Sequence, residues 1–575
     1  MTKGCYTCRR RRIVCDNGFP TCRKCRNAGK ECLGYQKPLV WVKGGVASRG
    51  KMMGLSFDDV SGPSQSSGNS FVMSSGAGMH SQSMLPFDSV NGDVDSAMDQ
   101  HHGALEHSPH YQTETPMYSL VDPLFQDVNK TSRFYINIFN HLSVRCLALY
   151  DEVRNPYREL IPYINGSPVL ADSLAAIGAL QFIYKSEDYG RSLINAAAGD
   201  ESSLRAGMSL MKPRDRKVYE HFLRLKQRAL HQLSTEVSHS TTRIDDRTVA
   251  AMFVLILLDV IESGNTSWMY HLEGAKNILK SRFSDFNRIP TTDGIYSFVI
   301  DSCLITEIMG STLARPGVLS RPFFSPSMGS AVLKRLEKTA FVGCPAYLLD
   351  VIFFVHAQRY SESDEKTAEY SLSFLSPSGE ATRAESPLAV LRHIDSFDDR
   401  EWAEEMQSYL TLPDLSARLA LARAYKAAVH LYARRVLSKT NAFASDCALT
   451  TTTTTDTILR SRRTVETELI QNLLSIPPED EHFKCLIWPT FIAGAESSSR
   501  EQRAITLRLL GFLWNGVYSL NLQNAACVLK VMWDKQDERR QATADRLPDE
   551  EEEEDDEGFD WIQELDQSST DWLFI

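Results

Sequence analysis

The sequence predicts a small cysteine-rich N-terminal domain and a large all-α domain, joined by a disordered linker and followed by a disordered acidic tail. Six of the twelve cysteines lie between Cys5 and Cys32. Apolar residues recur at helical spacing from about residue 125 to about residue 540, with little strand-like alternation. Charge is polarised, because residues 1–50 carry 12 Lys and Arg against 2 acids, whereas residues 549–575 carry 13 acids and no Lys or Arg.

Length and composition bound the class of protein. The 575 residues are 43% hydrophobic and 23% charged, which is ordinary for globular proteins and excludes disorder throughout the chain. The longest strongly apolar run, Val249 to Leu258, is far shorter than the ~20 residues that span a bilayer, so we expect no membrane association. The first residues show no apolar leader, so we expect a reducing compartment, where clustered cysteines bind metal rather than form disulfides.

The cysteine spacing predicts a site for two metal ions. The pattern is Cys-x2-Cys-x6-Cys-x6-Cys-x2-Cys-x6-Cys, in which each half repeats the same shape. Six thiolates complete two tetrahedral zinc sites only when two of them are shared, and by symmetry we expect Cys5 and Cys22 to bridge the two ions. So small a domain has no sizeable core, so the metal supplies folding free energy of order 10 kcal/mol. The expected ligands are Cys5, Cys8, Cys15, Cys22, Cys25 and Cys32.

Arginines follow the second cysteine. We expect a short helix there that carries Arg9 to Arg12, and because helical residues are 100° apart, some of these side chains face phosphates and others face bases. The planar guanidinium group matches the O6 and N7 atoms of guanine, which gives about 1–3 kcal/mol of discrimination per pair. The run also suits a nuclear-import signal, and a zinc module that binds protein instead of DNA stays open as an alternative.

The six-cysteine spacing, the basic run and Pro20 resemble the fungal Zn(II)2Cys6 binuclear cluster family of DNA-binding domains. The resemblance covers residues 5–32 and implies a domain over 1–36 that binds double-stranded DNA. In the family, the basic pair three and four residues after the second cysteine reads a CGG triplet, and here this pair is Arg11 and Arg12. Val14 departs from the family, which usually has a basic residue there. The expected phosphate contacts are Arg9, Arg10, Arg23, Lys24, Arg26 and Lys30.

The remaining boundaries follow from composition. Residues 37–51 form a basic extension, which either lengthens the DNA footprint or is a solvated linker, and residues 52–122 read as a disordered linker rich in Ser, Gly, Met and His. No heptad repeat follows the cysteines, so the protein either binds DNA as a monomer or forms a homodimer through its large domain. The helical segments that predict an all-α domain over 123–545 are 246–261 with a stop at Gly264, 346–360, 415–436, 458–474 and 505–522.

Three phrases in this region resemble the fungal-specific transcription factor domain: Asn155–Pro162, Trp268–Ala275 and Trp488–Gly494. The resemblance implies a regulatory domain that senses a metabolite or masks an activation function, with a small-molecule effector in some members. No enzyme motif is found, so we expect no catalysis. Singled-out polar residues have structural explanations: packing for His271, and helix-edge or capping positions for Asp259, Glu262 and Asp350.

The C-terminus, residues 546–575, combines nine consecutive acids, Asp549 to Glu557, with bulky apolar residues. This mixture is typical of disordered activation segments that fold onto a coactivator, with Trp561, Leu565 and Trp572 as anchors. A solvated end and a tail that covers the basic head are the alternatives. We therefore expect a nuclear activator of RNA polymerase II transcription that reads CGG-type triplets. Two other hypotheses remain: a receptor for an apolar metabolite, and a protein-interaction adaptor whose zinc module does not read bases.

Overall fold

A computed structural model divides the chain into two compact units, Met1–Pro86 and Phe87–Ile575. In the first unit the structure describes residues 4–5, 7–8, 11–16, 18, 21–30 and 32. In the second it describes residues 125–149, 155–186, 213–282, 295–319, 329–339, 342–360, 387–410, 415–439, 460–544 and 559–575. The predicted basic extension, the predicted linker and the run of nine acids therefore lie outside the described residues.

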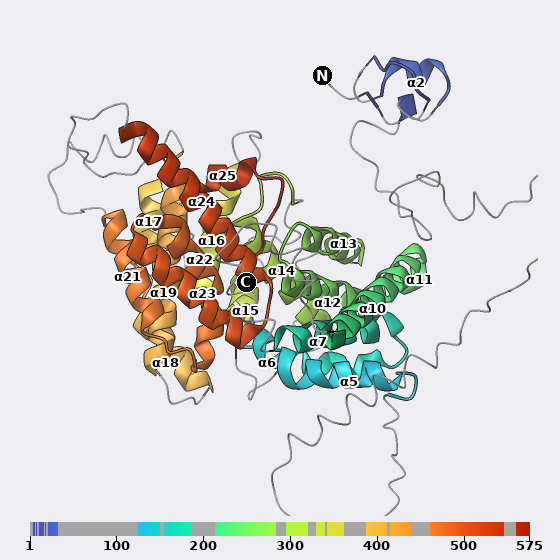
Figure 1. The fold of residues 1–575 in the computed structure, drawn as a ribbon, viewed down its shortest axis with the longest axis horizontal. Coiled ribbons are helices and arrows are strands. Elements are labelled where there is room, and N and C mark those ends of the chain that lie inside the picture. The colour runs from blue at the N-terminus through green and yellow to red at the C-terminus, as the bar shows by residue number, and fades with distance from the viewer. Residues whose placement is uncertain are drawn as a thin grey trace, which may run out of the picture. The chain divides into compact units, whose positions relative to one another are not determined.

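Across these described ranges the second unit consists of helices and turns, which confirms the predicted all-α class (Figure 1). Its N-terminal part contains α5 (Lys130–Ile138), the π-helix η2 (Phe139–Ser143), α6 (Val144–Leu147), the 3-10 helix η3 (Arg158–Ile164), α7 (Pro168–Tyr184), α10 (Pro213–Ser238), α11 (Ser240–Arg243), α12 (Asp246–Glu262), α13 (Ser267–Arg282) and α14 (Ile295–Ser311). Its C-terminal part contains α15 (Gly329–Thr339), α16 (Ala346–Tyr360), α17 (Pro387–Asp395), α18 (Asp399–Leu410), α19 (Leu415–Leu437), α21 (Arg462–Leu474), the 3-10 helix η7 (Glu481–Leu486), α22 (Ile487–Glu496), α23 (Arg500–Val517), α24 (Asn521–Ala544) and α25 (Trp561–Gln567). None of the helices in the described ranges is both long and apolar enough to cross a bilayer.

Helix α7 lies at the centre of the N-terminal part and packs against α5, α10 and α12. Nearly all of its side chains are buried, because the helix is apolar around its whole circumference. Gly178 permits the close crossing with α5: a Cβ atom at this position would lie 2.0 Å from the carbonyl oxygen of Tyr135. Any other residue here would push the two helices apart.

Helix α12 confirms the segment predicted at 246–261 and ends one residue later, at Glu262. Asp245 caps the helix, because its backbone is extended and its carboxylate accepts a hydrogen bond from the Arg247 amide at 2.8 Å. Gly264 follows the end of the helix with a left-handed φ of +68°. A glycine adopts this conformation at little cost, which is why it stops the helix here.

Helix α19 is the central helix of the C-terminal part and is more deeply buried than one apolar face predicts. Helix α19 packs against α16, α17, α18, α21, α22 and η7. Besides the predicted apolar positions, the charged Arg418 and the polar His430 are buried on this helix. Many of its residues are alanine, and such small side chains allow neighbours to approach on every side.

The apolar segment predicted at 505–522 is two helices rather than one. Helix α23 ends at Val517, Tyr518 adopts a left-handed conformation with φ 52°, and α24 begins three residues later at Asn521. The break lets the Leu520 amide donate to the carbonyl of Ile261 at 2.9 Å. This contact joins the C-terminal part to the end of α12.

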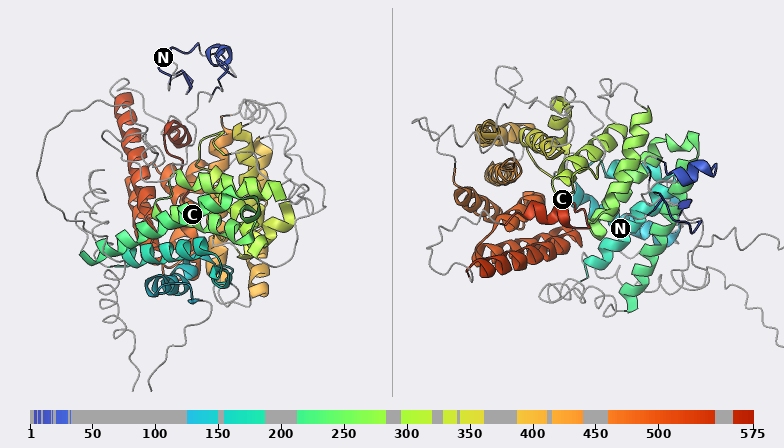
Figure 2. Two further views of the ribbon diagram at one scale, coloured as in Figure 1. Left: turned by 90° about the vertical axis from the view of Figure 1, so that its right-hand side faces the viewer. Right: turned by 90° about the horizontal axis from the view of Figure 1, so that it is seen from above.

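The prediction of a disordered tail is wrong for residues 559–575. They form α25, capped by the Asp560 side chain, and a terminal strap that runs back among the helices, so that the end marked C lies inside the helical unit in Figures 1 and 2. The Leu573 amide donates to the carbonyl of Gly264 at 2.9 Å. Transfer of bulky apolar side chains out of water is favourable, and here these side chains are buried in the core of the same chain. The large domain therefore extends to residue 575 instead of ending at 545.

Candidate metal centre and nucleic-acid interface

The first unit gathers six cysteine sulfurs around two positions. The Sγ atom of Cys22 lies 3.6 Å from those of both Cys5 and Cys8, and the Sγ atoms of Cys5 and Cys25 are 3.7 Å apart. Two sulfurs bound at ~2.3 Å to one tetrahedral ion lie about 3.8 Å apart, so these separations fit zinc. The fully buried cysteines are Cys5, Cys8, Cys22 and Cys25, and the partly buried ones are Cys15 and Cys32.

Two groups of four cysteines have their sulfurs close enough for one ion each, and Cys5 and Cys22 belong to both groups. The sequence predicts this sharing. Burial raises the pKa of the Cys5 thiol to about 12, so without a cation the sulfur keeps its proton at neutral pH. A bound zinc ion reverses this, because a coordinating thiol is deprotonated by the charge of the metal.

Each half of the cluster starts with the same local turn. The amide of Cys8 donates to the sulfur of Cys5 at 3.4 Å, and the amide of Cys25 donates to the sulfur of Cys22 at 3.3 Å. These hydrogen bonds stabilise the charged form of the two shared sulfurs. We call each Cys-x2-Cys turn a knuckle. In both halves, backbone hydrogen bonds therefore prepare the knuckle for metal binding.

The similarity of the two halves continues past each knuckle. The amides of Ile13 and Lys30 each donate to the carbonyl of the second cysteine of their own knuckle, both at 3.0 Å. The preceding residues, Arg12 and Gly29, are both left-handed, with φ angles of 56° and 59°. Glycine is the usual residue in this conformation, so Arg12 holds a backbone shape that a side chain disfavours.

The sequence predicts a short helix that carries Arg9 to Arg12. In the structure Arg11 and Arg12 instead lie in a turn that follows a short helical segment. The helical residues described here are Thr7 and Cys8, and the Arg11 amide donates to the carbonyl of Thr7 at 3.1 Å. Both arginine side chains are exposed. The first two arginines of the run lie outside the described residues.

The predicted phosphate contacts of the second half lie on and after α2 (Arg23–Asn27). Three of them, Arg23, Lys24 and Arg26, are exposed on this helix, and Lys30 is exposed three residues after its end. The Arg26 guanidinium donates to the hydroxyl of Thr21 at 3.2 Å. Their charges thus face water around the metal cluster, where they are accessible to an anionic partner.

Asp16 connects the two halves of the cluster, which was not expected from the sequence. Its carboxylate accepts hydrogen bonds from the amides of Arg23 at 2.9 Å and Lys24 at 3.1 Å. These bonds lower the pKa of Asp16 below its usual value. They join the first half of the cluster to the helix of the second half. Its position directly after Cys15 is the only signal for this role in the sequence.

The predicted activation anchors are packed inside the large unit. Trp561 is fully buried, and its indole Nε1 donates to the Glu496 carboxylate at 2.6 Å. Leu565 is also buried, whereas Trp572 is half-buried and stacks on Phe574 with ring centroids 5.5 Å apart. The expectation that these side chains are exposed and ready for a coactivator is therefore wrong.

Acidic residues of the same segment form ion pairs with the body of the unit. Asp571 is fully buried and makes a bidentate pair with Arg315, at 2.9 Å to Nε and 2.6 Å to Nη2. Asp566 pairs with Arg359 at 2.6 Å. A bidentate pair restricts the relative orientation of its two side chains. These ion pairs therefore fix the position of the C-terminal segment and also neutralise its acids.

Three of the polar residues singled out from the sequence, Asp259, Glu262 and His271, belong to one ion-pair network with Lys226. Buried Asp259 accepts from Lys226 and from the Nδ1 atom of His271, both at 2.9 Å, and Lys226 also pairs with Glu262. Desolvation raises the pKa of Asp259, but its two partners outweigh that effect and the net pKa is lowered. The packing role expected for His271 agrees with this contact, and for Asp259 a buried ion pair replaces the expected helix-edge position.

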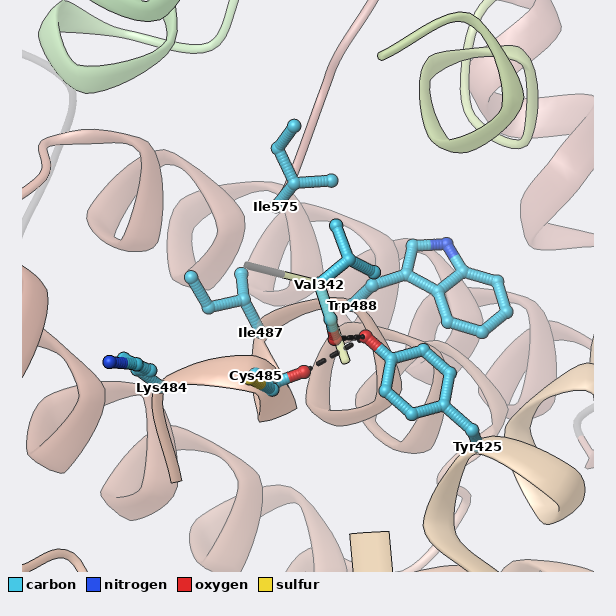
Figure 3. A pocket seen from close by; sticks show the side chains of 7 residues that line it. All are labelled: Val342, Tyr425, Lys484, Cys485, Ile487, Trp488 and Ile575. Atoms are coloured by element: carbon cyan, nitrogen blue, oxygen red, sulfur yellow. Dashed lines mark hydrogen bonds between the residues drawn. The ribbon is translucent and has the colours of Figure 1, made fainter. Parts of the chain in front are cut away.

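A small cavity lies between η7, α19 and the end of the chain (Figure 3). The Tyr425 hydroxyl lies 2.7 Å from the Val342 carbonyl and 2.9 Å from the Cys485 carbonyl, so the hydrogen bonding of this hydroxyl is already satisfied within the protein. Trp488 and Ile575 close the apolar side. The cavity volume of about 10 Å³ leaves room for no more than about one water molecule, so this cavity does not support a metabolite receptor.

Comparison with known families accounts for both units. A model of the fungal Zn(2)-Cys(6) binuclear cluster domain matches residues 3–41, and a model of the fungal specific transcription factor domain matches residues 133–575. The second match includes α25 and the terminal strap. No solved structure matches the chain.

Three characterised proteins are similar to this chain. The acriflavine sensitivity control protein acr-2 of Neurospora crassa is 23% identical and covers 100% of this chain and 97% of its own length. White-opaque regulator 2 of Candida albicans is 61% identical over 33 residues, 6% of this chain and 7% of that protein. The transcriptional regulatory protein pro1 of N. crassa is 50% identical over 38 residues, 7% and 5% of the two chains.

Proposed function

Because this chain belongs to the family with the fungal specific transcription factor domain and its N-terminal cluster binds two zinc ions, we propose that it is a nuclear activator of RNA polymerase II transcription that reads CGG-type triplets. Family membership makes the chain a DNA-binding regulator of transcription. The triplet, the compartment and the direction of regulation are the proposal.

The observation that supports triplet reading is the turn at Arg11 and Arg12. Hydrogen bonds hold this turn on both sides, from the Arg11 amide and from the Ile13 amide, while both guanidinium groups remain exposed. A rigid backbone loses little entropy on binding, and an arginine can then donate two hydrogen bonds to one guanine. Metal, turn and arginines together supply what recognition of guanines in the major groove needs.

Binding of the full zinc-loaded chain to CGG-containing and scrambled duplexes tests the triplet. We expect Arg12→Ala to lower the preference for CGG by about 5- to 150-fold, which corresponds to ~1–3 kcal/mol, with zinc content unchanged. Lys30→Ala is the matched control: it should weaken binding to both duplexes alike and reduce the salt slope by about one contact. Equal binding of the wild-type chain to both duplexes would favour the adaptor hypothesis, and a CGG preference that survives in Arg12→Ala would assign base reading to another residue.

A reporter placed behind CGG triplets tests the direction of regulation. We expect the full chain to raise reporter transcription, and Arg12→Ala to remove the effect without changing the amount of protein. Lower transcription with the wild-type chain would make the protein a repressor.

A further inference from the structure

The two halves of the zinc cluster share a backbone but carry different side chains at equivalent positions. Counting from the second cysteine of each knuckle, Arg12 corresponds to Gly29, Ile13 to Lys30, and Val14 to Glu31. The φ angles at the first pair and the amide hydrogen bonds at the second pair agree between the halves. Each half therefore serves as an internal control for the other.

The second half has the residues that a water-exposed turn favours. Gly29 takes the left-handed conformation, where a Cβ atom would meet nothing within 4 Å, and charged residues follow it. The first half has an arginine in the same strained conformation, followed by two β-branched apolar residues. Val14 is 81% exposed and Ile13 is 38% exposed. This surface is suited to contact with a partner that is partly apolar rather than with water.

We propose that Val14, supported by Ile13, contacts the C5-methyl group of a pyrimidine next to the guanines read by Arg11 and Arg12. The inference rests on the proposed function, since it takes the arginine turn to face DNA. The base edges of the major groove are polar except for one apolar group, the C5-methyl of thymine. An exposed valine next to base-reading arginines therefore has a single chemical partner on that surface.

The backbone favours such a contact. Its hydrogen bond to the Cys8 carbonyl fixes Ile13, and the metal ligand Cys15 follows Val14 directly, so this short segment is held at both ends. The χ1 angle of valine is restricted by its branched Cβ atom. Little conformational freedom is then lost when the methyl groups meet, and the contact adds to affinity.

The test uses the full zinc-loaded chain and duplexes that differ by one methyl group. Each thymine beside the triplet is replaced in turn by deoxyuridine, and each cytosine by 5-methylcytosine. We expect one position at which loss of the methyl weakens binding about fourfold, the effect of burying one such group, and at which 5-methylcytosine binds better than cytosine. Val14→Ala should abolish this difference while zinc content and CGG preference stay the same.

Lys30→Ala, which changes the equivalent turn of the second half, is the control and should leave the thymine-to-uracil ratio as in the wild type. Equal binding of thymine and uracil at every flanking position, with CGG preference intact, overturns this inference and leaves the proposed function standing. A Val14→Ala chain that changes its oligomeric state but not its methyl preference also overturns it, because the valine then contacts protein. Loss of all sequence preference in the wild type overturns the proposed function itself.

Discussion

At the scale of single residues, several side chains of this protein occupy positions that oppose their intrinsic preferences. Arg12 holds a left-handed backbone in the metal-binding head. Glu466 on α21 is only 2% exposed, and its Oε1 atom has no hydrogen-bond partner among the described residues. Such residues lower stability on their own account, so each one gives a measurable prediction.

Arg12→Gly should separate stability from recognition. Glycine removes the left-handed strain, worth about 1 kcal/mol, but adds freedom to the unfolded chain, so we expect zinc retention to be equal or slightly improved. CGG preference should fall as in Arg12→Ala, because the guanidinium is lost. Chelator competition and DNA binding measure the two effects. Weaker zinc retention in the glycine variant than in the alanine variant would show that the turn is not strained.

Glu466→Gln should stabilise the large unit at alkaline pH. Burial, with a contribution from Glu496, raises the pKa of Glu466 from 4.5 to about 7 against the opposing charge of Arg462. The unfolded chain therefore releases this proton at lower pH than the folded chain, and stability falls as pH rises from about 4.5 to about 7. Above pH 7 the variant, which never ionises, should gain on the order of 1–3 kcal/mol.

Thermal unfolding at pH 5 and pH 8 tests this expectation for Glu466→Gln. The gain should be fully present at pH 8 and several times smaller at pH 5. The exposed Glu479 provides the matched control, since Glu479→Gln should shift neither transition by more than about 0.5 kcal/mol. An equal gain at both pH values would mean that ionisation of Glu466 is not its cause.

At the scale of elements, α25 and the terminal strap join parts of the large unit that are distant in sequence. Asp571 of the strap pairs with Arg315, 256 residues away, and Asp566 of α25 pairs with Arg359, 207 residues away. The Trp268 indole, on α13, donates to the carbonyl of Asp571 at 3.2 Å. An acidic and aromatic composition thus serves here to fill and neutralise a groove of the same chain.

Trp561→Ala should strongly destabilise the large unit. The variant loses a fully buried indole that packs against Phe491 with ring centroids 6.4 Å apart, and it leaves the Glu496 carboxylate without one donor. Large aromatic deletions in cores cost about 3–5 kcal/mol, which thermal or urea unfolding would detect. Trp572→Ala, at a half-buried position, should cost clearly less. Unchanged stability in Trp561→Ala would restore the view of residues 559–575 as an exposed segment.

At the scale of the whole molecule, the chain combines two units with different sources of stability. Among its described residues, the first unit has an apolar cluster made of its cysteines, whereas the second buries one large apolar cluster. Metal binding is folding free energy in the first unit, and burial of apolar surface is the main term in the second. Loss of metal should therefore act on one unit alone.

A zinc chelator should abolish DNA binding while leaving the thermal transition of the large unit in place. Among the described residues, the groups that could hold a metal ion are confined to the six N-terminal cysteines, so we expect a chelator to act on the first unit. Circular dichroism would then lose little helical signal, and added zinc would restore binding. A lower melting temperature of the helical unit after chelation would contradict this separation.

The sequence by itself determined the metal centre, the all-α class of the large unit and several of its helices. Ligand spacing and helical periodicity are local properties, because a zinc ion restricts the conformation of a 28-residue segment and a helix is defined by neighbours three and four residues apart. The left-handed turn at Arg12 was not predictable, because a residue with a side chain disfavours that conformation. The hydrogen bonds from the Arg23 and Lys24 amides to Asp16 were not predictable either, since they depend on how the two halves of the cluster meet.

Only the tertiary structure decided the place of the C-terminal segment. Alternating acids and aromatic residues suit an activation segment and a buried strap equally well. In both cases the apolar side chains become buried and the acids pair with cations, on a partner protein in the first case and on the same chain in the second. The choice depends on whether the same chain offers a fitting groove. In this chain the groove is formed by Trp268, Arg315, Arg359 and Glu496. These residues come together only when helices far apart in sequence have packed.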